Sequence, residues 1–272
     1  MSATTDMTPL QRIVEARRAR VATDFGTLTS ADLERLACCS RAPREVIDVL
    51  RDRADVAVIA EVKKASPSAG PIAPACEASK QALHYEAGGA AMISVLTEPD
   101  FFAGSFADLS DVADAVSVPV LAKDFVVAPA QLFAARGHGA DAVLLMVSVL
   151  GDELSAYMDV AATLRLTPLV EVVDEAELDI ALHAGAELIG VNARDFATLG
   201  VDLAVQRELV AKATALGAVV VAASGISSRA DVQAAAAAGA DAVLVGETLM
   251  RAPFPEDVLE ELTGVARAPV TA

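Results

Sequence analysis

The stretch Gly239-Ala-Asp-Ala-Val-Leu-Val245 decides the fold, because a Gly-Ala pair leads into a short apolar run at four places in the chain. The other pairs start at Gly89, Gly139 and Gly185, so successive pairs are 50, 46 and 54 residues apart. Each pair follows a stretch of helical composition, and glycine is the usual residue just beyond a helix. The repeat therefore predicts helices and strands that alternate at a regular spacing.

Four further apolar runs lie between the repeats, which brings the number of candidate strands to eight. The runs cover residues 57–61, 92–95, 119–122, 143–146, 168–172, 188–191, 219–222 and 243–245. Near-continuous apolar strands are typical of a parallel sheet covered by helices on both faces. Eight such units, roughly 25 residues apart, predict an α/β protein with a (β/α)8 TIM barrel. An open doubly wound sheet is the alternative, but it gives no reason for the even spacing.

Residues 1–55 precede the first strand and have helical patterns. Leu10, Ile13 and Val14 form one apolar face among the arginines Arg12, Arg17, Arg18 and Arg20. Ser30 is the expected N-cap of a second helix, and a third is expected over residues 43–50. We expect residues 1–272 to form a single barrel domain, with this extension packed on the barrel and residues 267–272 frayed.

The composition excludes several classes of protein. Of 272 residues, 54% are hydrophobic, and 21 Lys and Arg stand against 38 Asp and Glu, which gives a net charge of −17. High apolar content argues against disorder, and the negative charge argues against nucleic-acid or anionic-membrane partners. An anionic small-molecule substrate must then be held by a few placed cations and backbone amides.

The cysteines and the N-terminus indicate the compartment. Cys38, Cys39 and Cys76 form neither a disulfide framework nor a zinc motif. The start of the chain lacks the basic and apolar regions of a signal peptide, and no apolar run reaches the roughly 20 residues that span a bilayer. We expect a soluble cytoplasmic protein.

Polar residues stand where the predicted strands end, which is where barrel enzymes place their catalytic groups. Glu61 and Lys63 end the first strand and point the same way, because side chains two apart share a face. The later strand ends hold Lys123, Glu171, Asn192, Arg194, Ser224, Gly225 and Gly246. Lysines beside carboxylates suit acid–base chemistry on an anionic substrate. For any single residue, a structural salt bridge at the rim is the alternative.

Other segments predict binding features of the same mouth. Residues 224–226 and Gly246 follow the seventh and eighth strands, where backbone N–H groups and glycines bind phosphate in many barrels. The loop over residues 97–102 carries two phenylalanines, which indicate a lid or an aryl pocket. His84, His138 and His183 stand at expected helix ends, where an imidazole needs no functional role.

Six segments together carry a family resemblance. They are residues 58–68, 93–100, 119–125, 169–172, 189–195 and 224–226, and the first contains the specific motif Glu-x-Lys-x-x-Ser-Pro-Ser over residues 61–68. These segments resemble the indole-3-glycerol-phosphate synthases of tryptophan biosynthesis. The resemblance implies a carbon–carbon lyase, a carboxy-lyase, which closes the indole ring of 1-(2-carboxyphenylamino)-1-deoxyribulose 5-phosphate with loss of carbon dioxide and water.

The same resemblance implies a role for each matching residue. Lys123 is the implied general acid at the substrate ketone, and we expect partial burial to lower its pKa. Glu171 is the implied base for dehydration, and Lys63 holds the substrate carboxylate or acts as a second acid. Glu61 and Asn192 orient these groups, and Ser224 joins the catalytic set. The implied binding residues are Ser66, Arg194, Gly225 and Gly246 for anionic groups, and Phe102, Phe125, Leu144 and Met146 for the aryl ring. Neither a metal nor an organic cofactor is implied, and a monomer or small homo-oligomer is expected.

One position departs from the family pattern. The family usually has Glu directly before the Ser-Gly of the seventh strand, where this chain has Ala223. A missing preorganising group can cost on the order of 10²-fold in rate. Three interpretations stay open: a working enzyme with a tolerated or engineered change, a weakly active or inactive paralogue that binds the substrate, and a related ribulose-phosphate isomerase. The last ranks lowest, because isomerisation does not need the arrangement of Glu61, Lys63 and Lys123.

Overall fold

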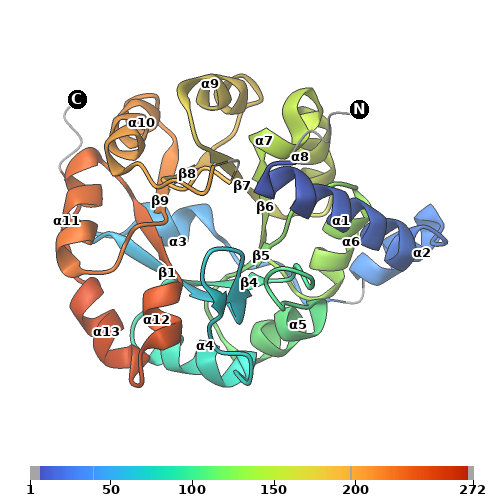
Figure 1. Cartoon of the computed structure of the whole chain (residues 1–272), viewed down its shortest axis with the longest axis horizontal. Coiled ribbons are helices and arrows are strands. Elements are labelled where there is room, and N and C mark those ends of the chain that lie inside the picture. The colour runs from blue at the N-terminus through green and yellow to red at the C-terminus, as the bar shows by residue number, and fades with distance from the viewer. Residues whose placement is uncertain (1–6, 39, 197, 269–272) are drawn as a thin grey trace, which may run out of the picture.

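Eight parallel strands form a closed barrel in the computed structural model, which describes residues 7–38, 40–196 and 198–268 (Figure 1). The strands follow the chain order around the barrel, and β1 closes it by pairing with both β4 and β10. They are β1 (Ala57–Val62), β4 (Met92–Leu96), β5 (Val120–Lys123), β6 (Ala142–Met146), β7 (Thr167–Val172), β8 (Leu188–Asn192), β9 (Val219–Ala223) and β10 (Ala242–Val245). The predicted (β/α)8 barrel is confirmed, and every predicted strand boundary lies within one residue of the observed one.

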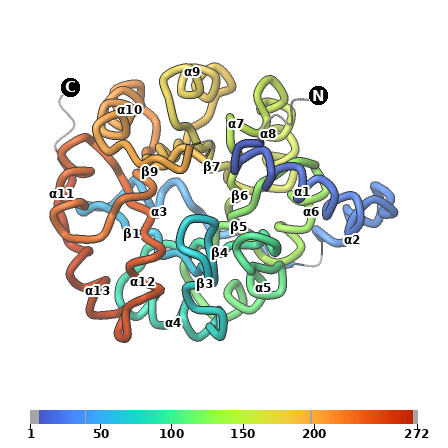
Figure 2. The backbone as a smooth tube through the Cα atoms, in the orientation of Figure 1, coloured from blue at the N-terminus to red at the C-terminus, as the bar shows by residue number. Residues whose placement is uncertain are grey.

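A ring of helices surrounds the barrel (Figure 2). Its members are α4 (Ala78–Ala87), α5 (Phe106–Ala115), α6 (Ala130–Gly137), α7 (Val147–Leu150), α8 (Leu154–Thr163), α9 (Glu175–His183), α10 (Leu203–Ala215), α11 (Arg229–Ala238), α12 (Glu247–Arg251) and α13 (Pro255–Leu262), with a 3-10 turn over Gly151–Glu153. The glycines of the four repeats all have φ between 80° and 101°, a left-handed conformation that glycine adopts without steric cost. The repeat is therefore a helix stop followed by a strand start. A small antiparallel hairpin, β2 (Ala65–Ser66) with β3 (Gly70–Pro71), was not predicted.

Alternating side chains divide the core into two layers. Val58, Ala60 and Val62 of β1 point outward into the layer between barrel and helices. Ala57 and Ile59 point inward and pack with the inward side chains of the other strands. Glu61 continues the inward set, so it projects inside the barrel near the C-terminal end of β1. The alternation of β1 thus places a carboxylate at the mouth.

The N-terminal extension runs from one end of the barrel to the other. Helix α1 (Pro9–Phe25) lies across the C-terminal end of the barrel, drawn in dark blue in Figure 1, and its Leu10 N–H donates to the Phe196 carbonyl at 3.2 Å. Helix α2 (Ser30–Cys38) packs on α6, and Leu50 of α3 (Ile47–Arg51) joins the inner core. The extension therefore contacts the barrel along its length.

Two local expectations for this extension are wrong. Thr29 rather than Ser30 caps α2, because the Thr29 hydroxyl accepts the Asp32 N–H and the Asp32 carboxylate accepts the Thr29 N–H. The third helix begins at Ile47 rather than at residue 43, because the Arg44 N–H donates to a carboxylate of the barrel instead of entering a helix.

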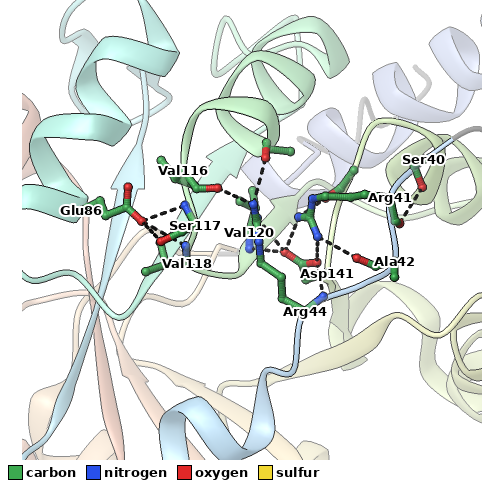
Figure 3. Close-up of polar contacts among 12 residues, drawn as sticks. Ser40, Arg41, Ala42, Arg44, Glu86, Val116, Ser117, Val118, Val120 and Asp141 are labelled. Atoms are coloured by element: carbon green, nitrogen blue, oxygen red, sulfur yellow. Dashed lines mark hydrogen bonds and ion pairs between the residues drawn. The ribbon is translucent and has the colours of Figure 1, made fainter.

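That carboxylate belongs to Asp141, which anchors the extension at the N-terminal end of the barrel (Figure 3). Its two oxygens accept from the Arg41 guanidinium, both at 2.8 Å. They also accept the N–H of Arg44 at 2.7 Å and of Val120 at 2.8 Å. Asp141 is completely buried, so these N–H donors replace the water that would otherwise stabilise its negative charge.

Asp241 repeats the arrangement one hundred residues later. It accepts the Val220 N–H at 2.7 Å and forms an ion pair with Arg267. Arg267 also donates to the carbonyl oxygen of Arg53. The expected fraying is therefore wrong for Arg267, and residues 269–272 lie outside the described residues. Among the helices of the described ranges, none combines the length and apolar character that a bilayer crossing needs.

Candidate active site

A cavity of about 400 Å³ opens at the C-terminal end of the barrel. It gathers most of the residues that the sequence singled out. Those lining it are Glu61, Lys63, Ser66, Phe102, Lys123, Asn192, Arg194, Ser224, Gly225 and Gly246. Glu171 lies just behind Asn192, and Phe125, Leu144 and Met146 line a recess that shares Phe102 and Lys123 with this cavity. The strand ends thus bring the predicted set together at one mouth.

A carboxylate between two lysines forms the charged centre of the cavity. Glu61 Oε1 lies 2.8 Å from Lys63 Nζ, and Glu61 Oε2 lies 3.7 Å from Lys123 Nζ. All three side chains are largely buried, with Lys123 at 13% exposure. The Lys63–Glu61–Lys123 cluster therefore holds two positive charges against one negative charge, which suits an anionic substrate.

Charged neighbours shift the pKa of Lys123 and of Glu61. Burial alone would lower the pKa of Lys123, but attraction to Glu61 and Glu171 outweighs it and raises that pKa above its usual value. Burial alone would raise the pKa of Glu61, but Lys63 and Lys123 lower it. The expected lowering of the Lys123 pKa is therefore wrong, because the charged neighbours dominate over desolvation. Lys123 is an ammonium group at neutral pH.

Asn192 fixes the second carboxylate. Its Nδ2 donates to Glu171 Oε1 at 3.0 Å, and its Oδ1 accepts the backbone N–H of Arg194 at 3.0 Å. Glu171 on β7 and Asn192 on β8 are both buried. The Asn192 amide is held at both ends, so it keeps the Glu171 carboxylate in one orientation.

The loop after β9 lines the cavity next to Asn192, and two of its residues have unusual backbone conformations. Ser224 has φ +67° and Gly225 has φ +76°. A left-handed serine costs roughly 1 kcal/mol or more, and such strain is concentrated at functional sites. Ser66 of β2 lines the same cavity, and its hydroxyl accepts the Ala69 N–H at 3.1 Å.

Position 246 requires glycine for a structural reason that the sequence did not reveal. A Cβ at this position would lie 2.4 Å from Glu61 Oε1 and 3.0 Å from Lys63 Nζ. Its place after the eighth strand predicted close approach by an anion. In the structure, the absence of its side chain gives room to the Glu61–Lys63 pair itself.

The recess beside Lys123 is aromatic. Phe102 and Phe125 have ring centroids 5.9 Å apart, and Phe196 meets Phe125 edge-on at 5.5 Å. Phe196 lines both the recess and the main cavity, and it was not among the predicted site residues. Its signal was present, since it follows Arg194 by two residues in the loop after a strand. The recess has about 10 Å³ of free volume, which is room for roughly one water.

Ala223 faces the cavity at the end of β9. It lies between Asn192 and Leu244 in the strand register and is 5% exposed. Its methyl group offers no hydrogen bond, so the site has no carboxylate at this position. The three histidines do not line the cavity. Within the described part of the chain, no cluster of three or more His, Cys, Asp or Glu residues is arranged to hold a metal.

The comparisons with known proteins give the family. Residues 10–262 match the family model described as indole-3-glycerol phosphate synthase. Curated proteins of that name include one from Mycobacterium avium (strain 104), 44% identical over 263 residues and 96% of each chain, and one from Mycobacterium ulcerans (strain Agy99), 45% identical over 266 residues and 96% of each chain. Another, from Beutenbergia cavernae, is 44% identical over 264 residues and 97% of each chain.

Solved structures confirm the architecture alone. A 3-hexulose-6-phosphate synthase has a TM-score of 0.62 at 18% identity and covers 76% of this chain and 98% of its own. A thiamine phosphate pyrophosphorylase from Pyrococcus furiosus has a TM-score of 0.57 at 18% identity, with 80% and 96% covered. Sequence identity over nearly the whole chain, together with a barrel mouth that gathers the motif residues, leads to one conclusion. The chain belongs to the indole-3-glycerol phosphate synthase family.

Proposed function

We propose that the protein is an indole-3-glycerol phosphate synthase of tryptophan biosynthesis, a lyase acting on 1-(2-carboxyphenylamino)-1-deoxyribulose 5-phosphate. The observation that carries the proposal is the Lys63–Glu61–Lys123 cluster, which lies between an aromatic recess and a loop rich in serine and glycine. Such a mouth suits a molecule with a carboxylated ring at one end, a phosphate at the other and a ketone between them.

Ring closure is the first step. The ring carbon that bears the carboxylate attacks the ketone carbon, and the electron pair of the C=O bond moves to oxygen. Lys123 supplies the proton that turns this oxygen into a hydroxyl, because its ammonium is buried at the junction of cavity and recess. Glu61 keeps Lys123 charged, and Lys63 holds the substrate carboxylate.

Decarboxylation and dehydration complete the reaction. The bond to the carboxylate breaks, carbon dioxide leaves, and the electron pair of that bond restores the aromatic ring. The new hydroxyl then accepts a proton from Lys63, the second acid, and leaves as water, while Glu171 takes the proton from the carbon next to nitrogen, which forms the indole double bond. Asn192 orients Glu171 for this step.

Binding of the remaining groups follows from the lining of the cavity. Ser66, Ser224, Gly225 and Gly246 form the phosphate side, with Arg194 near the same anionic groups. Phe102, Phe125, Leu144 and Met146 receive the aryl ring. A chain of net charge −17 can bind a polyanion here, because four cationic side chains line the cavity against two carboxylates.

A fluorescence assay tests the proposal directly. The chain contains no tryptophan, so indole emission reports the product against a low protein background. Wild-type protein should convert the carboxyphenylamino substrate, and Lys123→Ala should serve as the blank. Wild-type protein that binds the substrate in a calorimeter yet produces no more indole than the blank would overturn the proposed activity and support a binding protein instead.

A further inference from the structure

A buried ion pair joins the N-terminal helix to the end of β5. Arg17 Nε donates to Asp124 Oδ1 at 2.8 Å, and Arg17 Nη2 donates to Asp124 Oδ2 at 2.5 Å. The two side chains are 2% and 4% exposed. Two parallel hydrogen bonds fix the angle as well as the distance between the groups. The pair therefore sets how α1 sits on the barrel.

Asp124 passes this constraint to the active site. It follows Lys123 directly, and its Oδ1 accepts the N–H of Phe125 at 2.8 Å. Its Oδ2 also accepts the hydroxyl of Thr97 at 3.1 Å. A single carboxylate thus ties Arg17, the end of β4 and the backbone that carries both Lys123 and Phe125.

A second buried carboxylate fixes the neighbouring loop. Glu98 accepts the backbone N–H groups of Asp100, Phe101 and Phe102 at 3.0, 2.7 and 3.1 Å. Burial raises the pKa of Glu98, and the negative charge of Asp124 acts in the same direction. The positive charge of Arg17 attracts the negative charges of both Asp124 and Glu98. Replacing Arg17 with an uncharged residue would therefore leave two buried carboxylates close together.

Helix α1 also contacts the loop that carries Phe196, the third phenylalanine of the recess. The Leu10 N–H donates a hydrogen bond to the Phe196 carbonyl. The recess has room for about one water. An aryl ring therefore fits only when the phenylalanines around it keep, or adopt, well-defined positions. Arg17 lines neither the recess nor the main cavity, so it acts through the residues that it holds.

We propose that Arg17 is a positioning residue that uses α1 to hold Lys123 and the aryl-binding phenylalanines in their productive arrangement. The inference rests on the proposed function and adds a residue outside the cavity to its machinery. A displacement of about 1 Å in a reacting group can cost 10²-fold in rate. The effect of Arg17 is therefore expected on the aryl end of the substrate and on turnover, and not on the phosphate end.

The test compares Arg17→Met with Arg18→Met, since Arg18 is the next residue of the same helix and is exposed. Indole fluorescence gives kcat and KM, inhibition by inorganic phosphate reports the phosphate side, and circular dichroism reports folding. Arg17→Met should lose about 10²-fold in kcat/KM, with the phosphate inhibition constant unchanged within twofold. Arg17→Lys should recover part of the loss, because it keeps the charge but not the two parallel bonds. Arg18→Met should match wild type.

Two outcomes would overturn the proposal: a folded Arg17→Met that matches Arg18→Met, or phosphate inhibition that weakens in parallel with turnover. Should Arg17→Met fail to fold, Asp124→Asn and Arg17→Lys/Asp124→Asn decide the matter. The proposal expects the double variant to be no worse than Asp124→Asn, whereas additive losses would contradict it. An inactive wild type would refute the proposed function instead, and calorimetric binding of the substrate to the same variants would still test Arg17.

Discussion

At the scale of single residues, Lys123 shows how neighbours decide chemistry. Its place at a strand end follows from the alternation of apolar runs, and so do the places of Glu61 and Glu171. The direction of its pKa shift does not follow, because it depends on a 3.7 Å separation between groups on different strands. A sequence pattern orders residues along strands but does not measure distances across the barrel.

Glu61→Gln tests the charge balance. Loss of Glu61 removes the main attraction that raises the Lys123 pKa, while burial continues to lower it, and Glu171 and Lys63 remain as the other charged neighbours. The alkaline limb of the kcat profile should therefore move to lower pH than in wild type. Indole production measured across alkaline pH checks this, and an unmoved limb would show that Glu61 does not control Lys123.

Ala223→Glu tests the departure from the family pattern. The methyl group faces the cavity beside Asn192, so a carboxylate there would supply the preorganised acceptor that the site lacks. We expect kcat to rise, by up to about 10²-fold, and Ala223→Gln to give a smaller gain. A fall or no change in kcat would show that this chain works without that carboxylate.

At the scale of elements, the sequence pattern predicted the strand bounds well and the helix bounds of the N-terminal extension less well. Strand positions follow from apolar runs and helix stops, which are local signals. The burial of Arg17 does not, because its partner Asp124 is 107 residues away, and an arginine on a helix is usually solvated. The cap at Thr29 and the late start of α3 depend in the same way on side-chain contacts that a pattern does not contain.

Helix α9 contains a carboxyl group that destabilises the fold when ionised. Burial raises the pKa of Glu177 from 4.5 to about 7, so the stabilising protonated form is lost as pH rises through that value. Glu177→Gln should therefore raise the melting temperature at pH 8 and leave it unchanged at pH 4. Thermal unfolding at both pH values, with the exposed Glu208→Gln as control, checks this. An equal effect at the two pH values would contradict the assignment.

At the scale of the whole molecule, the two ends of the barrel have different roles, one in substrate binding and the other in stability. Substrate-facing groups gather at the C-terminal end, whereas Asp141 and Asp241 anchor the terminal segments at the other end. The division was foreseeable for the barrel class. The anchoring was not, because the aspartates that follow two of the four Gly-Ala pairs do not reveal in the sequence that they meet Arg41 and Arg267.

Asp141→Ala should destabilise the protein without changing its chemistry. The substitution breaks the ion pair with the Arg41 guanidinium, which keeps only the carbonyls of Ala42 and Gly139, and it leaves two backbone N–H groups without their acceptor. We expect a loss of about 3–5 kcal/mol in the free energy of unfolding, measured in urea, with KM and kcat unchanged where the variant is folded. Asp152→Ala, at an exposed aspartate, is the control. A loss no larger than that of the control would contradict the anchoring role.

The proposed reaction begins with the proton that Lys123 gives to the substrate ketone, and Lys123→Ala measured for both binding and turnover tests this step most directly. Calorimetry should give a substrate dissociation constant close to that of wild type, because Lys63 and the phosphate side remain. Indole production should fall by about 10³-fold or more, the upper part of the range for loss of a general acid. A variant that binds normally and turns over within tenfold of wild type would show that another group supplies the proton.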